Sequence, residues 1–186
     1  MKRKVVDGDI IPRAQLLFLI KNYDGYKNIR DRALVAFLYL TGARISEVVR
    51  QIKKYQLEIK DLDGTQYLVI ANVNCLKRKE GNEAKRNIPI NIDKEMSFLK
   101  YIFEWVDELA EEECIFPISR QTAHNILIRM DENMWPHLMR HLRLTHLTTD
   151  YGFSAGELKN LTGWSNTSPA DSYIHLNWMD IARKMK

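Results

Sequence analysis

The sequence predicts a mainly helical α+β domain with one small antiparallel β-sheet. Apolar side chains recur at helical spacing before residue 57 and again after Pro89. Between these two parts, residues 67–73 are rich in β-branched and aromatic side chains, and residues 86–90 follow as a second extended run. A hairpin or small sheet inserted between two helical parts accounts for all three observations.

The helices before the sheet are indicated by the residues at their ends. Pro12 suits the first turn of a helix, and residues 28–40 form a second helix. That helix is expected to end at Gly42, because glycine readily adopts the left-handed conformation found at helix C-termini. Ser46 is expected to cap a third, short helix that residues 51–57 continue.

After the sheet, the chain is expected to be helical to its end. The predicted helices cover residues 94–110, 119–131, 136–150, 154–161 and 168–182. Residues 1–11 carry little periodicity and are expected to be an arm or the remnant of a linker, so that residues 12–186 form the domain.

Composition narrows the class of protein. The 186 residues include 28 Lys+Arg and 24 Asp+Glu, a formal net charge of +4. This mildly basic balance is compatible with nucleic-acid binding but is also common among other proteins. Cys75 and Cys114 lie outside any metal-binding spacing and predict reduced thiols. No apolar run of about 18 residues occurs, so we expect a cytoplasmic protein with no membrane partner.

The first candidate for chemistry is Arg44, in the run Thr41-Gly42-Ala43-Arg44-Ile45-Ser46-Glu47. It lies where one helix ends and another begins. A guanidinium beside the free backbone N–H groups of a helix start makes an anion site that suits a phosphate. The alternative is an ordinary surface or ion-paired arginine.

The second candidate is the helix that Pro136 opens, where His137, Arg140 and His141 fall at positions i, i+3 and i+4 on one face. A proton carrier then lies beside a bidentate phosphate ligand. The alternative is an exposed polar face with one core histidine. A metal site fits poorly because no cysteine or carboxylate is suitably spaced, and we expect no metal and no other cofactor.

The third candidate is Tyr173, which lies nine residues after Trp164 on a helix that Pro169 could open. A single tyrosine or tryptophan is more often a packing residue at the edge of a core. Only its combination with the two arginine motifs points to chemistry.

In this order, Thr-Gly-x-Arg-x-Ser-Glu, His-x-x-Arg-His, and Leu-x-Gly-Trp followed nine residues later by Tyr resemble the catalytic domain of tyrosine recombinases and phage-type integrases. The resemblance runs from about Pro12 to Arg183. It implies a site-specific recombinase that cleaves and rejoins double-stranded DNA through a covalent 3′-phosphotyrosyl intermediate, without metal. It also implies a homotetramer assembled on DNA.

The resemblance further implies roles for the residues of the three motifs. Arg44 and Arg140 would hold the scissile phosphate, and His137 would assist proton transfer. Trp164 would donate its indole N–H to a phosphate oxygen, and Tyr173 would be the nucleophile.

Supporting residues follow from the same resemblance. Glu47 would orient the site, and His141 would lie behind the residues that touch the phosphate. The family keeps a catalytic lysine in the hairpin; Lys77 is preferred as the general acid and Lys79 is second. The basic residues expected to contact DNA are Arg78, Lys79, Lys85, Arg86 and Arg143.

Two other functions stay open at this point. The chain could be a non-catalytic DNA-binding protein in which residues 155–172 form a helix-turn-helix, or a relaxase similar to type IB topoisomerases. Proximity of Tyr173 to Arg44 and Arg140 would argue against the first. The motifs begin too early for the N-terminal DNA-clamping domain that family members usually carry, so a fragment, a short protein and a decayed copy are all compatible with the sequence.

Overall fold

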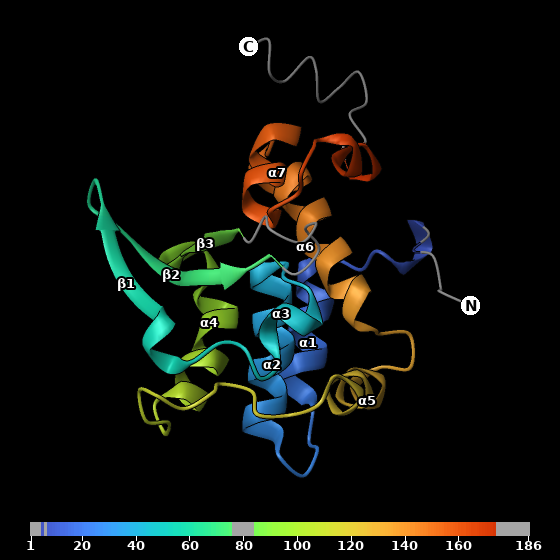
Figure 1. The fold of residues 1–186 in the computed structure, drawn as a ribbon. Coiled ribbons are helices and arrows are strands. Elements are labelled where there is room, and N and C mark those ends of the chain that lie inside the picture. The colour runs from blue at the N-terminus through green and yellow to red at the C-terminus, as the bar shows by residue number, and fades with distance from the viewer. Residues whose placement is uncertain (1–4, 6, 76–83, 174–186) are drawn as a thin grey trace.

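The computed structural model describes residue 5 and residues 7–75 and 84–173 of the chain (Figure 1). Within these residues, the fold comprises seven α-helices and a three-stranded antiparallel sheet of order β1-β2-β3. The predicted fold class, mainly helical with one small antiparallel sheet, is confirmed.

The central element is α2 (Asn28–Thr41), which is buried on every side. Residues 33–40 are all at most 1 % exposed, which is typical of a helix that is apolar around its whole circumference. The helices α1 (Arg13–Asn22), α4 (Ile92–Val106) and α6 (Pro136–Tyr151) pack against it. As predicted, α2 ends at Gly42, whose φ of 57° is left-handed.

The sheet contains one strand that the sequence analysis missed. β2 (Thr65–Asn74) and β3 (Lys85–Asn91) match the predicted strands, but β1 (Leu57–Leu62) lies beside β2 and begins inside the segment expected to be helical. Only the 3-10 helix η2 (Lys54–Gln56) is helical there. β1 is an edge strand with exposed apolar side chains, so it lacks the alternation that identifies a half-buried strand.

The short helix α3 (Ile45–Val48) starts two residues earlier than expected. Its N-cap position is held by Arg44 and not by Ser46. The backbone N–H of Arg44 donates to the Glu47 carboxylate at 2.9 Å. A glutamate three residues into a helix commonly closes its start in this way.

The remaining helices are α5 (Arg120–Met130), α7 (Ala155–Thr162) and the 3-10 helices η1 (Asp7–Asp9) and η3 (Ser168–Ser172). The described part of the helix predicted over 168–182 is the 3-10 helix η3, and so not an α-helix. Residues 174–182 lie outside the described residues.

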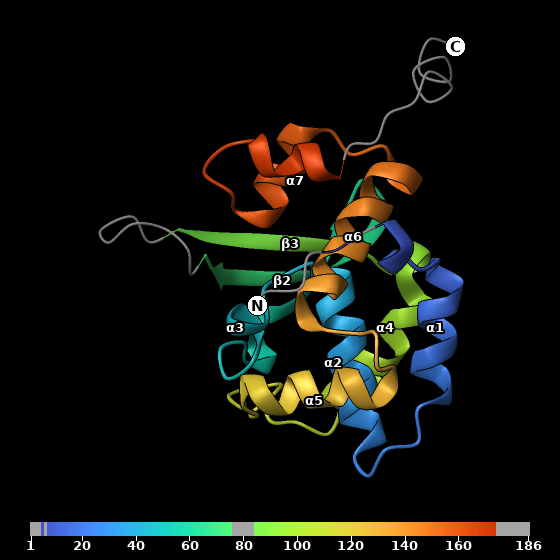
Figure 2. The same ribbon diagram turned by 90° about the vertical axis from the view of Figure 1, so that its right-hand side faces the viewer.

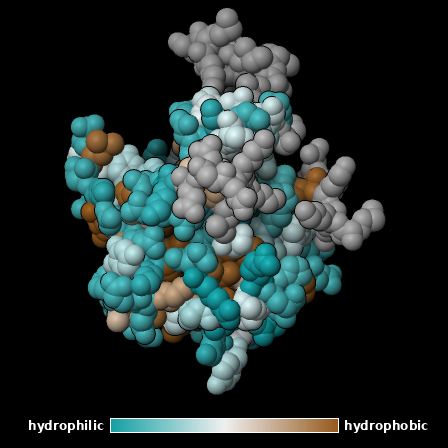
Figure 3. All heavy atoms as spheres, viewed as in Figure 1, coloured by the Kyte–Doolittle hydropathy of each residue, from teal (hydrophilic) through white to brown (hydrophobic). Residues whose placement is uncertain are grey.

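Two apolar cores result, and α6 contributes to both. The larger core surrounds α2, whereas a small separate core lies between the C-terminal half of α6, α7 and η3. Figures 1 and 2 show α7 and η3 beyond the β3 side of the sheet, away from the main helical layer. The face in Figure 3 is mainly hydrophilic. No helix in the described part of the chain is long and apolar enough to cross a bilayer.

Candidate active site

The Glu47 carboxylate joins two arginines from different elements. Arg44, before α3, donates to it at 2.7 Å, and Arg86, on β3, donates to it at 2.9 Å. Burial alone would raise the pKa of Glu47, but the charges and hydrogen bonds of Arg86 and Arg44 outweigh burial and hold this pKa below its usual value. Glu47 is therefore ionised at neutral pH and fixes both guanidinium groups.

Arg140, on α6, reaches the same region from the other side. It is 3 % exposed, and its Nη1 donates to the Gly42 carbonyl at 2.7 Å. Its Nη2 is buried without a hydrogen-bond partner. Burial, followed by the charge of Arg44, lowers the pKa of Arg140 to about 10, so it remains a cation at neutral pH. A buried N–H of a cation without a partner is a ready donor for an anion.

Trp164 and Tyr173 cover this guanidinium from the small C-terminal core. The Arg140 guanidinium lies 5.5 Å from the centre of the Trp164 ring, and the Tyr173 ring stacks on Trp164 with ring centres 5.8 Å apart. Thr148 holds the backbone of Tyr173 by donating to its carbonyl at 2.8 Å. Burial raises the pKa of Tyr173, while the positive charges of Arg140 and Arg44 oppose that shift.

The two histidines of α6 complete the arrangement. His141 Nε2 lies 3.4 Å from the Tyr173 hydroxyl and 3.1 Å from His137 Nε2. His137 is exposed, whereas His141 is half-buried. The structure thus brings together Arg44, Glu47, His137, Arg140, His141, Trp164 and Tyr173.

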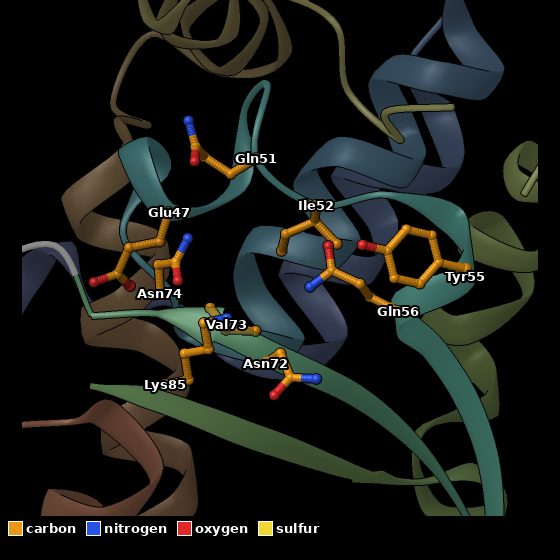
Figure 4. A pocket seen from close by; sticks show the side chains of 9 residues that line it. All are labelled: Glu47, Gln51, Ile52, Tyr55, Gln56, Asn72, Val73, Asn74 and Lys85. Atoms are coloured by element: carbon orange, nitrogen blue, oxygen red, sulfur yellow. The ribbon is translucent and has the colours of Figure 1, made fainter. Parts of the chain in front are cut away.

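A polar cavity of about 300 Å³ adjoins Glu47, between the segment after α3 and the strands β2 and β3 (Figure 4). Its lining includes the amide side chains of Gln51, Asn72 and Asn74. Lys85, one of the predicted DNA contacts, is exposed and also lines the cavity. Such a lining suits polar groups and is unsuited to an apolar ligand.

Arg86 and Arg143 do not lie where DNA contacts were expected. Arg86 is bound by Glu47 and donates to Cys75 Sγ at 3.2 Å, and Arg143 donates to Glu95 at 2.6 Å. Both arginines are buried. Each guanidinium is thus turned toward a buried carboxylate, an arrangement that favours a structural role over a contact with the DNA backbone. Lys77, Arg78 and Lys79 lie outside the described residues.

A second buried carboxylate was not singled out from the sequence. Glu95, on α4, accepts hydrogen bonds from Arg143, Arg13 and the Tyr151 hydroxyl at 2.6, 2.6 and 2.7 Å. A glutamate at a position where the helix turns its apolar face inward is the signal that could have identified it. This network ties α1, α4 and α6 together beside α2.

Gly163 connects the base of the hairpin to the segment that carries Trp164. Its φ is +69°, and a Cβ at this position would collide with Cys75 Sγ. Cys75 is the last described residue before the hairpin tip, and its sulfur is bound by Arg86. A glycine is required here for both its backbone conformation and its lack of a side chain.

Comparisons with a family profile and with curated proteins point to the same protein family. The profile described as "Phage integrase family" matches residues 11–179. Among curated relatives, tyrosine recombinase XerC of Staphylococcus epidermidis is 26 % identical over 176 residues, which cover 88 % of this chain and 55 % of the relative. XerC of Roseiflexus castenholzii is 29 % identical over 195 residues, covering 92 % and 57 %. The chain therefore spans only part of the length of these relatives.

Solved structures share the fold. XerH site-specific recombinase bound to its difH substrate, in a pre-cleavage complex, superposes with a TM-score of 0.66 at 13 % identity, covering 98 % of this chain and 53 % of that one. The Tn1549 transposon integrase in complex with circular intermediate DNA gives 0.64 at 18 % identity, covering 100 % and 66 %. The family profile matches most of the sequence, and this chain belongs to the phage integrase family.

Proposed function

We propose that this chain cleaves and rejoins strands of double-stranded DNA, with Tyr173 as the nucleophile. The observation that carries the proposal is the position of the Tyr173 hydroxyl. It lies within the field of Arg140 and Arg44 and 3.4 Å from His141 Nε2. A tyrosine that only packs would need neither a histidine at its hydroxyl nor two cations near enough to oppose the rise in its pKa.

In the proposed reaction, Arg44 and Arg140 bind the non-bridging oxygens of a DNA phosphate. The Tyr173 oxygen attacks phosphorus in line, a P–O bond to tyrosine forms, and the bond to the 5′ oxygen breaks. Negative charge that develops on the non-bridging oxygens is stabilised by the two guanidinium groups and the Trp164 N–H. The phosphotyrosyl ester conserves the energy of the broken bond, so attack by a DNA hydroxyl reverses the step.

The leaving 5′ oxygen needs a proton. From the sequence alone, we propose that Lys77 supplies it, with Lys79 as the second candidate. A substrate with sulfur in place of the bridging 5′ oxygen tests this, because its leaving group needs no proton. The Lys77→Ala variant should cleave ordinary DNA about 10²- to 10⁴-fold more slowly than the unmutated chain. It should cleave the sulfur substrate at nearly the unmutated rate. If the sulfur substrate restores the rate of Lys79→Ala and not that of Lys77→Ala, Lys79 is the general acid.

The partner in this proposal is duplex DNA, and the assembly is a homotetramer formed by residues 12–186 on that DNA. The relatives' names and the DNA complexes of XerH and the Tn1549 integrase support a DNA substrate. Lys85 at the edge of the polar cavity is kept as a DNA contact because it is exposed. A helix-turn-helix protein is less well supported, since α7 is followed by the five-residue 3-10 helix η3.

The test is covalent capture of DNA. A pool of duplexes with randomised sequence, each carrying a nick that lets the cleaved fragment diffuse away, is incubated with the chain, and adducts that survive detergent are isolated and sequenced. Tyr173→Phe should abolish capture. Tyr26→Phe is the matched control, because Tyr26 is 97 % exposed and also loses only a hydroxyl. Capture by Tyr173→Phe, or none by the unmutated chain, would refute the proposal.

A further inference from the structure

Two histidines on one face of α6 form a chain of contacts that leads to the Tyr173 hydroxyl. His141 contacts the Tyr173 hydroxyl through Nε2 at 3.4 Å, and their rings are 4.8 Å apart. His137 points its own Nε2 at the same nitrogen of His141, at 3.1 Å. Helical spacing places both imidazoles on one face, but the direct hydroxyl contact is made by the inner one.

We infer that His141 is the general base for Tyr173, and that His137 serves the phosphate. This inference rests on the proposed function and deepens it. In the step, the phenolic O–H bond breaks, the proton moves to His141 Nε2, and the oxygen electron pair forms the bond to phosphorus. The distance of 3.4 Å is long for a hydrogen bond, but catalytic hydrogen bonds often shorten only when the substrate binds.

The contact between the two imidazoles restricts where their hydrogens lie. Two nitrogens at 3.1 Å need one hydrogen between them. If His141 Nε2 is to accept the Tyr173 proton, that hydrogen belongs to His137, and His141 carries its hydrogen on Nδ1. When a phosphate binds, the exposed His137 turns its Nε2–H to a phosphate oxygen, and the His141 lone pair becomes free for Tyr173.

The surroundings of His141 favour the neutral imidazole that a base requires. Burial, followed by the charges of His137 and Arg140, lowers the pKa of His141 to about 4. The groups that face it are His137 and Arg140 on α6 and Tyr173 after η3. A DNA phosphate held by Arg44 and Arg140 adds negative charge beside this ring, which raises its pKa toward that of the phenol in the bound state.

The kinetic test uses a duplex recovered by covalent capture and measures adduct formation in a single turnover. His141→Gln should slow this step by about 10²–10⁴, with unchanged DNA affinity, and His137→Gln by about tenfold or less. Thr145→Ala is the control, because Thr145 lies one turn further along α6 and is half-buried like His141. Added imidazole should restore part of the cleavage rate of His141→Ala, because free imidazole can replace the missing base. If His141 had only a structural role, added imidazole should not restore the rate.

A second measurement needs no DNA. Long-range proton–nitrogen NMR of the histidine side chains in the intact chain should show His141 at neutral pH with hydrogen on Nδ1 and none on Nε2. Hydrogen on His141 Nε2 would overturn the inference. So would a larger rate loss in His137→Gln than in His141→Gln. If the unmutated chain captures DNA and His141→Gln captures it equally fast, only this inference fails; if Tyr173→Phe still captures DNA, the proposed function fails first.

Discussion

Glu47 and Glu95 are two buried carboxylates in the same structural arrangement with different surroundings. Each is about 1 % exposed and lies between two arginines. Each has one inner arginine that is almost fully buried, Arg86 for Glu47 and Arg143 for Glu95. In both, the charges of the arginines hold the carboxylate pKa below its usual value against the opposing effect of burial.

The difference lies beyond the outer arginine of each pair. Arg44 and Arg13 have side chains that are equally exposed, at 23 %. Arg13 is closed in by the Tyr151 hydroxyl and by aromatic rings. Arg44 instead lies within electrostatic range of a third guanidinium, Arg140. The outer arginine of the Glu95 cluster is thus enclosed by aromatic side chains, whereas that of the Glu47 cluster lies near further positive charge that could attract an anion.

Removing the carboxylate charge of Glu95 should have the largest effect on stability. Glu95→Gln leaves Arg143 buried without a counter-charge, so we expect a loss of about 3–5 kcal/mol in the free energy of unfolding. Urea denaturation followed by circular dichroism measures it. A loss below about 1 kcal/mol would show that the Glu95 cluster is not a structural support.

Glu47→Gln should lower the rate of DNA adduct formation, whereas Glu95→Gln should not. Because Arg44 and Arg86 lose the group that orients them, adduct formation should fall by about 10- to 100-fold, the usual cost of removing a supporting partner. Glu95→Gln is the matched control and should keep the unmutated rate per folded molecule. Equal rate losses in both variants would erase the proposed distinction.

Acid should weaken both clusters in the same direction. Their folded pKa values lie below the unfolded value of about 4.3, so their stabilisation is complete above that pH and is lost as pH falls through the folded pKa. Each carboxylate contributes at most about 1.4 kcal/mol per pH unit to the slope. Between pH 3 and pH 6, the urea midpoint of unfolding should depend less steeply on pH in either glutamine variant than in the unmutated chain. An equally steep dependence would contradict the lowered pKa values of Glu47 and Glu95.

The smallest effect should come from the tyrosine that closes the Glu95 cluster. Tyr151→Phe removes a hydroxyl that bonds Glu95 at 2.7 Å, and about 0.5–1.5 kcal/mol of stability should be lost. Tyr26→Phe, at an exposed position, should leave the unfolding free energy unchanged. Cleavage rates should be unaffected in both variants, since neither tyrosine approaches the site that contains Arg44.

The sequence was sufficient where local chemistry determines structure. The end of α2 at Gly42 follows from one residue's backbone preference. The motif order predicted that Arg44, Arg140 and Tyr173 share one site, and the structure brings them near one another. β1 was missed because an edge strand is recognised through its partner, and the pairing of Leu57–Leu62 with β2 is a tertiary property.

The local sequence pattern also did not predict which charged side chains are buried. Arg86 lies in a basic stretch beside the hairpin tip, and only the folded structure shows that its charge is paired with Glu47. Likewise, spacing placed His137 and His141 on one face of α6, but which of them meets Tyr173 depends on how a distant segment docks.

The contact between Gly163 and Cys75 has a mechanical consequence. The segment that ends in Tyr173 and the strand end that leads into the hairpin tip meet at one point, where there is no room for a side chain. We therefore expect any side chain at position 163 to push the segment that carries Trp164 away from the strand end at Cys75, so that one substitution disturbs both.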